Sequence, residues 1–569
     1  MTYDLKIVGG DIVDGTGTER LRGDLGIKDG KVVAVGAVPG SAERTIDAAG
    51  LIVAPGFVDI HTHYDAQVLW DPMLTISPWH GVTTVVVGNC GFGIAPTRPE
   101  HRSLILRTLE RVEAMSLAAL EAGIGPDWPF VTFPEYMDAV ARRPLGINVA
   151  VMLGHTPLRL TVMGEDATER AARPDEIAAM KRLVAEAMDV GAVGFATSVS
   201  KVHIGYAGRP VPSRLAAFDE MLEIADAVGR SGHGIIQYNV GRDPRWDEYE
   251  ALHAKSGRPL VWTALLAGSL GPNSHRAQLA KAADQIARGL PIYPQGACRP
   301  IQIEFDFHSP VVFDTWASFA AARETADDAS RRAVYADPAF RTRVRRQADG
   351  RGPDDAAFMG KELEGDTRRA AFWTYVITEA SDPALKERKL ADVARERGKH
   401  AVDMMLDLAL VDLGTRMRAS QLNFVEDEVR EIIKDGNVVI GLGDGGAHLS
   451  QLCDACYATH LLGHWVREDG ALTLEQAVHR LTGATASLFG LVDRGRLAVG
   501  LPADIVVFDP AAIGASTLER VHDLPAGADR LIAHPRGIHA VIVNGEPLPP
   551  PGQVPERPSG RLLRQRRTA

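Results

Sequence analysis

The sequence predicts an α/β protein in which a (β/α)8, TIM-like barrel is joined to a small β-sandwich domain built from both chain ends. Two observations support this prediction. Between residues 55 and about 450, short apolar runs alternate with amphipathic helical stretches, and both ends of the chain contain Val- and Ile-rich runs separated by glycine-containing turns. Strands that alternate with helices form a parallel sheet covered on both faces, and eight such units can close into a barrel.

The two chain ends have the pattern of β-hairpins. The stretches "DLGIKDGKVVAVG" near the N-terminus and "HAVIVNGEPL" at residues 539–548 each place a glycine-containing turn between two apolar runs. Because a barrel separates these segments, we expect residues 1–54 and 485–547 to pair in one sandwich domain.

The barrel is expected to comprise residues 55–484. Its predicted strands are residues 57–60 and the apolar runs "GVTTVVVGNC", "INVAVMLGH", "VGAVGFATS", "GHGIIQYNV", "RPLVWTALL", "LPIYPQGAC" and "NVVIGLGDGG". A charged, helix-prone stretch at about 324–400 interrupts the alternation and predicts a helical insertion on a barrel loop. The Pro-rich residues 548–569 predict an extended tail.

Charge and composition limit the partners of this protein. The chain has 62 Lys and Arg against 73 Asp and Glu, a net charge of −11, which disfavours nucleic acid as a partner. No apolar run approaches the ~18–20 residues of a membrane helix, and no signal peptide is recognisable. Four cysteines in a chain of this length do not form a disulfide scaffold. We expect a cytoplasmic protein with a small-molecule substrate, and the helical insertion is compatible with a homo-oligomer.

His61 and His63 lie at the end of the first predicted barrel strand. Side chains two residues apart on a strand point to the same face, and barrel enzymes build their sites at the carboxyl ends of the strands. Two structural, hydrogen-bonded histidines are the alternative. The position favours two ligands to zinc or another divalent ion.

Asp444 and Cys90 also follow apolar strands, at "VVIGLGDGG" and "TTVVVGNCG". A buried carboxylate needs a partner, and Asp444 could bind the metal and also move a proton during hydrolysis. A helix N-cap or turn role is the alternative for Asp444. For Cys90 the alternatives are a metal ligand and a small buried apolar residue.

Several motifs together resemble the metal-dependent amidohydrolase superfamily, and within it the N-acyl-D-amino-acid deacylases (D-aminoacylases). They are "GLIVAPGFVDIHTHYDAQ", "GVTTVVVGNCGFGIAP", "GHTPLR", "VGAVGFATS", "GDGGAH" and "GRLAVGLPADIVVFDP". The resemblance covers residues 1–547 and implies a barrel-plus-sandwich fold and hydrolysis of an amide by metal-activated water. It also implies that His61, His63 and Cys90 are ligands, and that Asp444 is both a ligand and the acid/base.

The chain departs from that family on two strands. The family places a metal-binding histidine after its fifth strand and another after its sixth, where this chain offers Gln237 and Asn239, and then Thr263. The metal could therefore be held by fewer ligands, by other groups, or be lost, so one or two ions per chain remain open. The candidate replacements, each of which could instead orient a ligand by a hydrogen bond, are His155, His203, His448 and Gln237.

Two further residues are candidates for substrate binding. The Arg159 guanidinium could pair with a substrate carboxylate, or it could form a salt bridge that holds loops together. Tyr206, in a glycine-rich loop, could donate a hydrogen bond to a developing oxyanion.

A second cluster of cysteines and histidines resembles a zinc motif, but its spacing does not favour a metal site. The spacing in "CDACYATHLLGHW" predicts Cys453, Cys456, His460 and His464 on one helix face. Ligands along one straight helix would span about 16 Å, too far for one tetrahedral ion. A buried helix face or a subunit contact is expected instead.

The sequence supports three functions. The first is a metal-dependent hydrolase of a C–N amide bond in a small, N-acyl amino acid-like substrate. The second is a hydrolase of cyclic amides, lactones or carbamates, and the third is a catalytically inactive barrel that acts as a binding or assembly protein.

Overall fold

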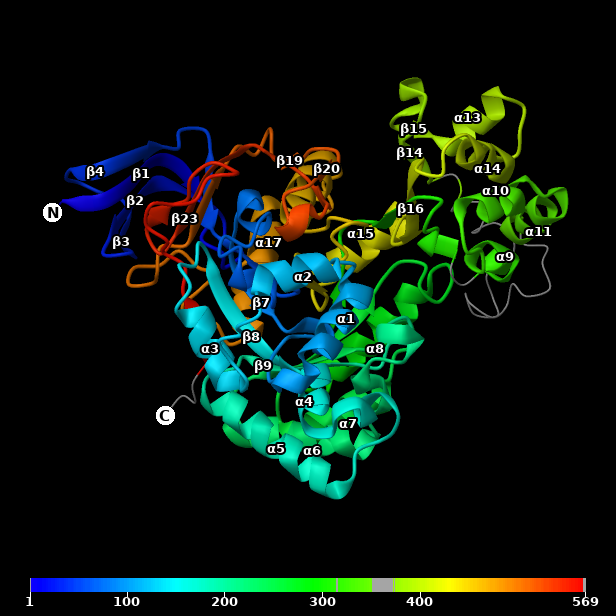
Figure 1. Ribbon diagram of the computed structural model, residues 1–569. Coiled ribbons are helices and arrows are strands. Elements are labelled where there is room, and N and C mark those ends of the chain that lie inside the picture. The colour runs from blue at the N-terminus through cyan, green and yellow to red at the C-terminus, as the bar shows by residue number, and fades with distance from the viewer. Residues whose placement is uncertain (1, 314–315, 350–371, 373, 566–569) are drawn as a thin grey trace. The chain divides into compact units, whose positions relative to one another are not determined.

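The chain folds into two compact units (Figure 1), which are seen in a computed structural model that describes residues 2–313, 316–349, 372 and 374–565. The first unit is drawn from Met1–Leu265, Ala277–Arg299 and Arg430–Ala569, and the second from Leu266–Arg276 and Pro300–Val429. No helix among the described residues combines the length and the apolar character needed to cross a membrane.

Eight parallel strands of the first unit follow one another in the order β17-β12-β11-β10-β9-β8-β7-β6. Backbone hydrogen bonds close the ring, because Asp444 N donates to His61 O (3.0 Å) and His63 N donates to Gly445 O (2.7 Å). The predicted (β/α)8 barrel is confirmed. Its strands are β6 (Phe57–Asp59), β7 (Val82–Val87), β8 (Asn148–Gly154), β9 (Gly194–Ser198), β10 (Ile235–Asn239), β11 (Leu260–Leu265), β12 (Ile292–Gly296) and β17 (Val439–Ile440).

The connecting helices bury one apolar stripe each. In α5 (Pro174–Asp189), Met180, Val184 and Ala187 recur at spacings of four and three and are all buried, as on one helix face. The other helices of this unit are α1 (Arg102–Glu113), α2 (Leu117–Ile124), α3 (Phe133–Ala141), α4 (His155–Met163), α6 (Phe218–Ser231), α7 (Trp246–Ser256), α16 (Tyr457–His460), α17 (Leu474–Leu481) and α18 (Gly483–Leu488), while α8 (Ser274–Ala287) and α15 (Glu426–Lys434) have residues in both units. From α18 and the residues after it, Ala486, Phe489 and Leu491 pack with the barrel strands.

An eight-stranded sheet unites the two chain ends, as predicted for the sandwich domain. The link is the antiparallel pairing of β5 with β18, in which Ile52 faces Phe508. Between β2 and β3, Asp29 and Gly30 both have positive φ, as a tight two-residue hairpin turn requires. The strands of this sheet are β1 (Tyr3–Ile12), β2 (Leu21–Lys28), β3 (Lys31–Gly36), β4 (Ala42–Asp47), β5 (Ile52–Pro55), β18 (Ile505–Phe508), β23 (Ile538–Val543) and β24 (Glu546–Pro547).

The tail predicted at residues 548–569, of which residues 566–569 lie outside the described part, returns to the barrel. Strand β25 (Leu562–Leu563) pairs in parallel with β8, opposite Val149 and Ala150. Strand β9 pairs with β8 only from Met152 onward. The tail therefore covers the part of the β8 edge that β9 leaves free.

The second unit has its own four-stranded sheet and aromatic core. The sheet order is β13 (Ile301–Phe305), β16 (Arg416–Leu422), β14 (Val376–Glu379) and β15 (Arg388–Lys389). Stacked rings of Phe313 and Phe319, with centroids 4.1 Å apart, lie at its centre. Its helices are α9 (Ala320–Arg323), α10 (Asp328–Ala336), α11 (Pro338–Ala348), α13 (Leu390–Glu396) and α14 (Ala401–Val411). The insertion predicted at 324–400 falls in this unit, and its residues 350–371 and 373 lie outside the described residues.

Candidate metal centre

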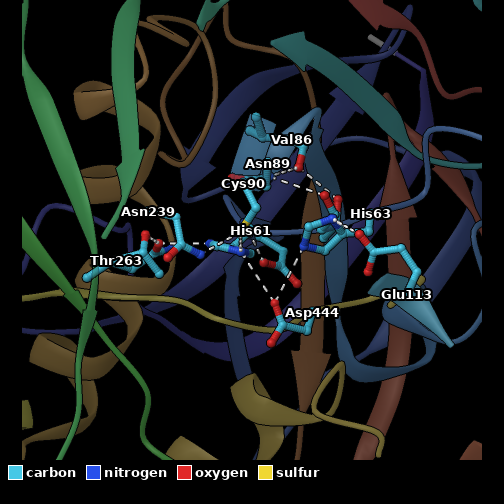
Figure 2. A network of polar contacts seen from close by, with 12 residues as sticks. His61, His63, Val86, Asn89, Cys90, Glu113, Asn239, Thr263 and Asp444 are labelled. Atoms are coloured by element: carbon cyan, nitrogen blue, oxygen red, sulfur yellow. Dashed lines mark hydrogen bonds and ion pairs between the residues drawn. The ribbon is translucent and has the colours of Figure 1, made fainter. Parts of the chain in front are cut away.

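Three buried side chains converge at the carboxyl ends of strands β6 and β7 (Figure 2). His61 and His63 follow β6, and Cys90 follows β7 in a short turn. One donor atom from each lies within 4.8 Å of the other two, and His61 Nε2 is 3.4 Å from Cys90 Sγ. Among the described residues, this is the one group of three or more His, Cys, Asp or Glu side chains with metal-ligand spacing.

Asp444 adds a carboxylate to this group. Its Oδ1 lies 3.4 Å from His61 Nε2 and 3.8 Å from His63 Nε2. Asp444 and Cys90 both have left-handed backbones, with φ of 43° and 55°, which costs a non-glycine residue roughly 1–2 kcal/mol. Such conformations cluster at functional sites, where the surrounding structure holds them.

The spacing of His61, His63 and Cys90 suits a zinc ion, and Asp444 lies beside the two histidines but outside the group whose donor atoms are all within 4.8 Å. With Zn–N and Zn–O of ~2.0–2.1 Å and Zn–S of ~2.3 Å, neighbouring donors of a tetrahedron lie about 3.3–3.6 Å apart. The N–S distance of 3.4 Å and the N–O distances of 3.4 and 3.8 Å lie in or close to that range. Imidazole, thiolate and carboxylate are also the ligand types that zinc takes in proteins.

The side chains of this group also shift one another's pKa values. Burial lowers the pKa of His61, but the nearby Cys90 and Asp444 together raise it by more, so that the net pKa is about 8. Burial raises the pKa of the Cys90 thiol, but His61 and His63 together lower it by more, so that the net pKa is about 7. The site therefore favours a thiolate, which is the form of cysteine that binds metal.

Each histidine is held by a hydrogen-bonding or charged group behind it. His61 Nδ1 lies 2.9 Å from Gln295 Oε1 at the end of β12, and because a carboxamide oxygen only accepts, Nδ1 donates and Nε2 is the nitrogen left to face a metal. His63 Nδ1 lies 3.2 Å from Glu113 Oε1, and both side chains are buried. Carboxylates and carbonyl groups in this position orient metal-binding histidines.

Glu113 and Gln295 were not among the residues predicted from the sequence. Glu113 is the last residue of α1, in the apolar stripe that includes Leu106 and Leu109. A carboxylate in an apolar stripe is the one signal that could have indicated Glu113.

Gln237, Asn239 and Thr263 form a hydrogen-bonded chain beside Cys90. Cys90 N donates to Gln237 Oε1 (3.0 Å), and Asn239 Nδ2 donates to Cys90 Sγ (3.0 Å). Gln237 Nε2 donates to Thr263 Oγ1 (2.9 Å), whose hydroxyl donates to Gln295 Oε1 (3.1 Å). These side chains hold the cysteine and, through Gln295, the first histidine.

His155 and Arg159 lie in a separate, fully buried network centred on Glu220. His155 Nε2 is 2.9 Å from Glu220 Oε1, and His155 Nδ1 is 2.8 Å from Thr197 Oγ1, so both ring nitrogens have partners. Arg159 forms an ion pair with Glu220 and donates to Arg170 O. The structure does not bring either residue into the His61–His63–Cys90 group.

His203 and His448 lie near the site but outside the donor group. The His203 ring is 5.1 Å from Phe92, and its Nδ1 is 2.8 Å from Ser198 Oγ at the end of β9. Burial lowers the pKa of His203 to about 3, and the charges of His448 and His63 lower it in addition, while that of Glu113 raises it. Tyr206 is 41% exposed, and its hydroxyl accepts a hydrogen bond from Arg107 (2.7 Å).

The second cysteine–histidine cluster does not form the single helix face predicted from its spacing. Helix α16 begins at Tyr457, so Cys453 and Cys456 precede it. Both cysteines are buried, in a cluster with Ile76, Leu531 and Ile532.

Comparisons with known proteins agree with this fold. The model of the amidohydrolase family matches residues 44–549. The D-aminoacylase of Alcaligenes xylosoxydans xylosoxydans is 31% identical over 566 residues, which cover 99% of this chain and 97% of that protein. The N-acyl-D-glutamate deacylase of the same organism is 30% identical over 99% of this chain and 96% of that protein. The crystal structure of N-acyl-D-glutamate deacylase from Bordetella bronchiseptica, complexed with zinc and a phosphonate inhibitor, matches with a TM-score of 0.65 and 26% identity over 99% of this chain and 100% of that one. A family match over most of the chain and full-length relatives at this identity show that the chain belongs to the amidohydrolase family.

Proposed function

We propose that this protein hydrolyses the amide bond of a small N-acyl-D-amino acid, with a zinc or similar divalent ion held by His61, His63 and Cys90, and with Asp444 beside the ion as a further oxygen ligand and proton carrier. The observation that carries the proposal is the convergence of three buried donors, one atom of each within 4.8 Å of the others, beside the half-buried carboxylate of Asp444. The deacylase relatives support the reaction type and the substrate class.

The ion would supply a Lewis acid that lowers the pKa of water toward neutrality and polarises the scissile carbonyl. Asp444 is the one member of the group with appreciable solvent exposure, at 18% of its side chain. Its carboxylate is placed to accept a proton from the attacking water and return that proton to the leaving nitrogen. His61 and His63 hold their Nε2 atoms toward Asp444 because Gln295 and Glu113 hold their Nδ1 atoms.

Hydrogen bonding at the ends of β10 and β11 supports one ion rather than two. Gln237 and Thr263 have their side chains engaged with Cys90, Gln295 and each other. Asn239 donates to the Cys90 sulfur. These groups stabilise the first ligand set and supply no imidazole for a second ion.

The two other functions considered from the sequence lack support. The full-length relatives named above are deacylases, which favours neither a hydrolase of cyclic amides, lactones or carbamates nor an inactive barrel. A cytoplasmic location is part of the proposal, and its support is that all four cysteines are free and buried.

The test is hydrolysis of N-acetyl-D-amino acids by the zinc-loaded protein. The measured quantity is the amount of free amine that is released. We expect turnover that is lost when a chelator removes the metal and restored by zinc. Absence of turnover with every N-acyl amino acid of either hand, at full metal occupancy, would contradict the proposal.

A further inference from the structure

Arg214 lies in the loop that follows β9, at the same end of the barrel as the metal centre. The loop is fastened to the strand end, because Ser213 Oγ donates to Ser198 O (2.7 Å) and His203 Nδ1 contacts Ser198 Oγ (2.8 Å). Arg214 follows Ser213 directly, in the short helix Pro212–Leu215. The backbone of Arg214 is therefore held at a fixed place beside the end of a barrel strand.

The Arg214 guanidinium has no carboxylate within 4.0 Å among the residues that the structure describes. Its one recorded hydrogen bond runs from Nη1 to His203 O (3.0 Å). Burial lowers the pKa of Arg214, and no acidic neighbour offsets that effect. Arg209 in the same loop differs, since it is more exposed and pairs with Glu169 at 3.0 Å.

Ring contacts connect Arg214 to the metal centre. The backbone carbonyl of His203 accepts a hydrogen bond from Arg214. The side-chain ring of His203 packs 5.1 Å from the ring of Phe92. The Phe92 ring in turn lies 6.4 Å from the ring of His63. Arg214 is thus linked to His63, a proposed ligand, through His203 and Phe92.

We propose that Arg214 binds the α-carboxylate of the substrate and thereby makes the enzyme select N-acyl amino acids over neutral amides. This inference rests on the proposed function. A guanidinium carries five N–H donors in a planar fork that matches a carboxylate, and Arg214 uses one of them within the protein. In an N-acyl amino acid the carboxylate is attached to the carbon that bears the scissile nitrogen, so a cation on a loop at this end of the barrel can bind it while the carbonyl faces the metal.

The experiment compares two substrates that differ only in that carboxylate, N-acetyl-D-alanine and N-acetyl-D-alaninamide, by release of acetate. For the acid, we expect Arg214→Gln to lower kcat/KM roughly 100-fold, mainly through KM, because a charge-assisted contact is lost. For the neutral amide, the same variant should change kcat/KM less than about threefold. Arg214→Lys should recover part of the loss, because it restores charge but not the fork.

The control is Arg209→Gln, which removes a surface cation from the same loop and should leave both substrates unaffected. Equal losses on the acid and the amide in Arg214→Gln would overturn the proposal, since a merely structural arginine would affect both alike.

Failure of the proposed function gives a different result. If the wild-type protein hydrolyses neither compound, the proposed reaction is wrong, and calorimetric binding of N-acetyl-D-alanine to the zinc-loaded protein still tests Arg214. Binding by wild type that Arg214→Gln abolishes would support the carboxylate site. Equal binding by both proteins, or binding by neither, would overturn it.

Discussion

The carboxylate of Glu113 lies 3.2 Å from Nδ1 of His63, and each side chain is 6% exposed. This buried pair joins helix α1 to the end of strand β6 and fixes the imidazole with Nε2 toward Asp444. A metal-binding histidine that is held in this way loses fewer orientations on binding.

Replacement of Glu113 should weaken metal binding. Glu113→Gln removes the charge that orients His63, and we expect zinc affinity to fall 10- to 100-fold, as measured by competition with a chromogenic chelator. Glu110→Gln alters an exposed residue of the same helix and serves as the control. Unchanged zinc affinity in Glu113→Gln would show that Glu113 does not orient His63 for metal binding.

Metal content should be about one zinc ion per chain. Cys90→Ala removes a donor and should lower this content after dialysis, as measured by elemental analysis. Cys298→Ala, at another free and buried cysteine, should keep the wild-type value. A content of two ions per wild-type chain would contradict the single site.

Asp444 should be essential for turnover. Asp444→Asn keeps an oxygen near the metal but cannot accept the proton, so we expect kcat to fall by roughly 10²–10⁴, with zinc content near the wild-type value. Wild-type kcat in this variant would rule out Asp444 as the acid/base.

Arg159 should matter for stability rather than substrate affinity. Arg159→Ala leaves Glu220 buried without its cation, and breaking such a pair costs about 3–5 kcal/mol of unfolding free energy. Urea unfolding measures this loss, and the KM of the folded fraction should be unchanged. A raised KM with normal stability would instead support the substrate role considered from the sequence.

His80 should make stability fall below neutral pH. Its side chain is fully buried, with Nδ1 2.8 Å from Thr459 Oγ1 and Nε2 3.0 Å from Ala533 O. Burial lowers the pKa of His80 from 6.5 to about 4. The unfolded chain therefore binds this proton more tightly, and the contribution, about 3 kcal/mol, is present above pH 6.5 and lost as the pH falls to 4.

The measurement is the urea midpoint at pH 7 and at pH 5. The decrease between these pH values should be smaller in His80→Gln than in wild type. His522→Gln, at an exposed histidine, should keep the wild-type decrease. Equal decreases in all three proteins would show that His80 does not titrate on unfolding.

The barrel, and the proximity of four candidate residues at one end of it, could be predicted because the signal is local. His61 and His63 share a face through the two-residue period of a strand, and Cys90 and Asp444 each follow an apolar run at a glycine turn. The parallel sheet then brings separate strand ends together.

Partners that depend on tertiary contact could not be predicted in the same way. Glu113 reaches His63 from the end of a helix, and nothing near either residue in the sequence indicates the pairing. The role of Arg159 could not be predicted for the same reason, because its partner Glu220 lies on another helix. The ion pair with Glu220 engages the guanidinium that the sequence suggested for substrate binding.

Strand β25 has a consequence for the order in which the barrel is completed during synthesis. Residues 149–150 of β8 leave the ribosome long before residues 562–563, which pair with them. Until then, that part of β8 exposes unpaired backbone groups beside an apolar cluster that Leu563 joins. A nascent chain therefore presents an open sheet edge for most of its synthesis, and truncation before residue 562 would leave that edge permanently available to other strands.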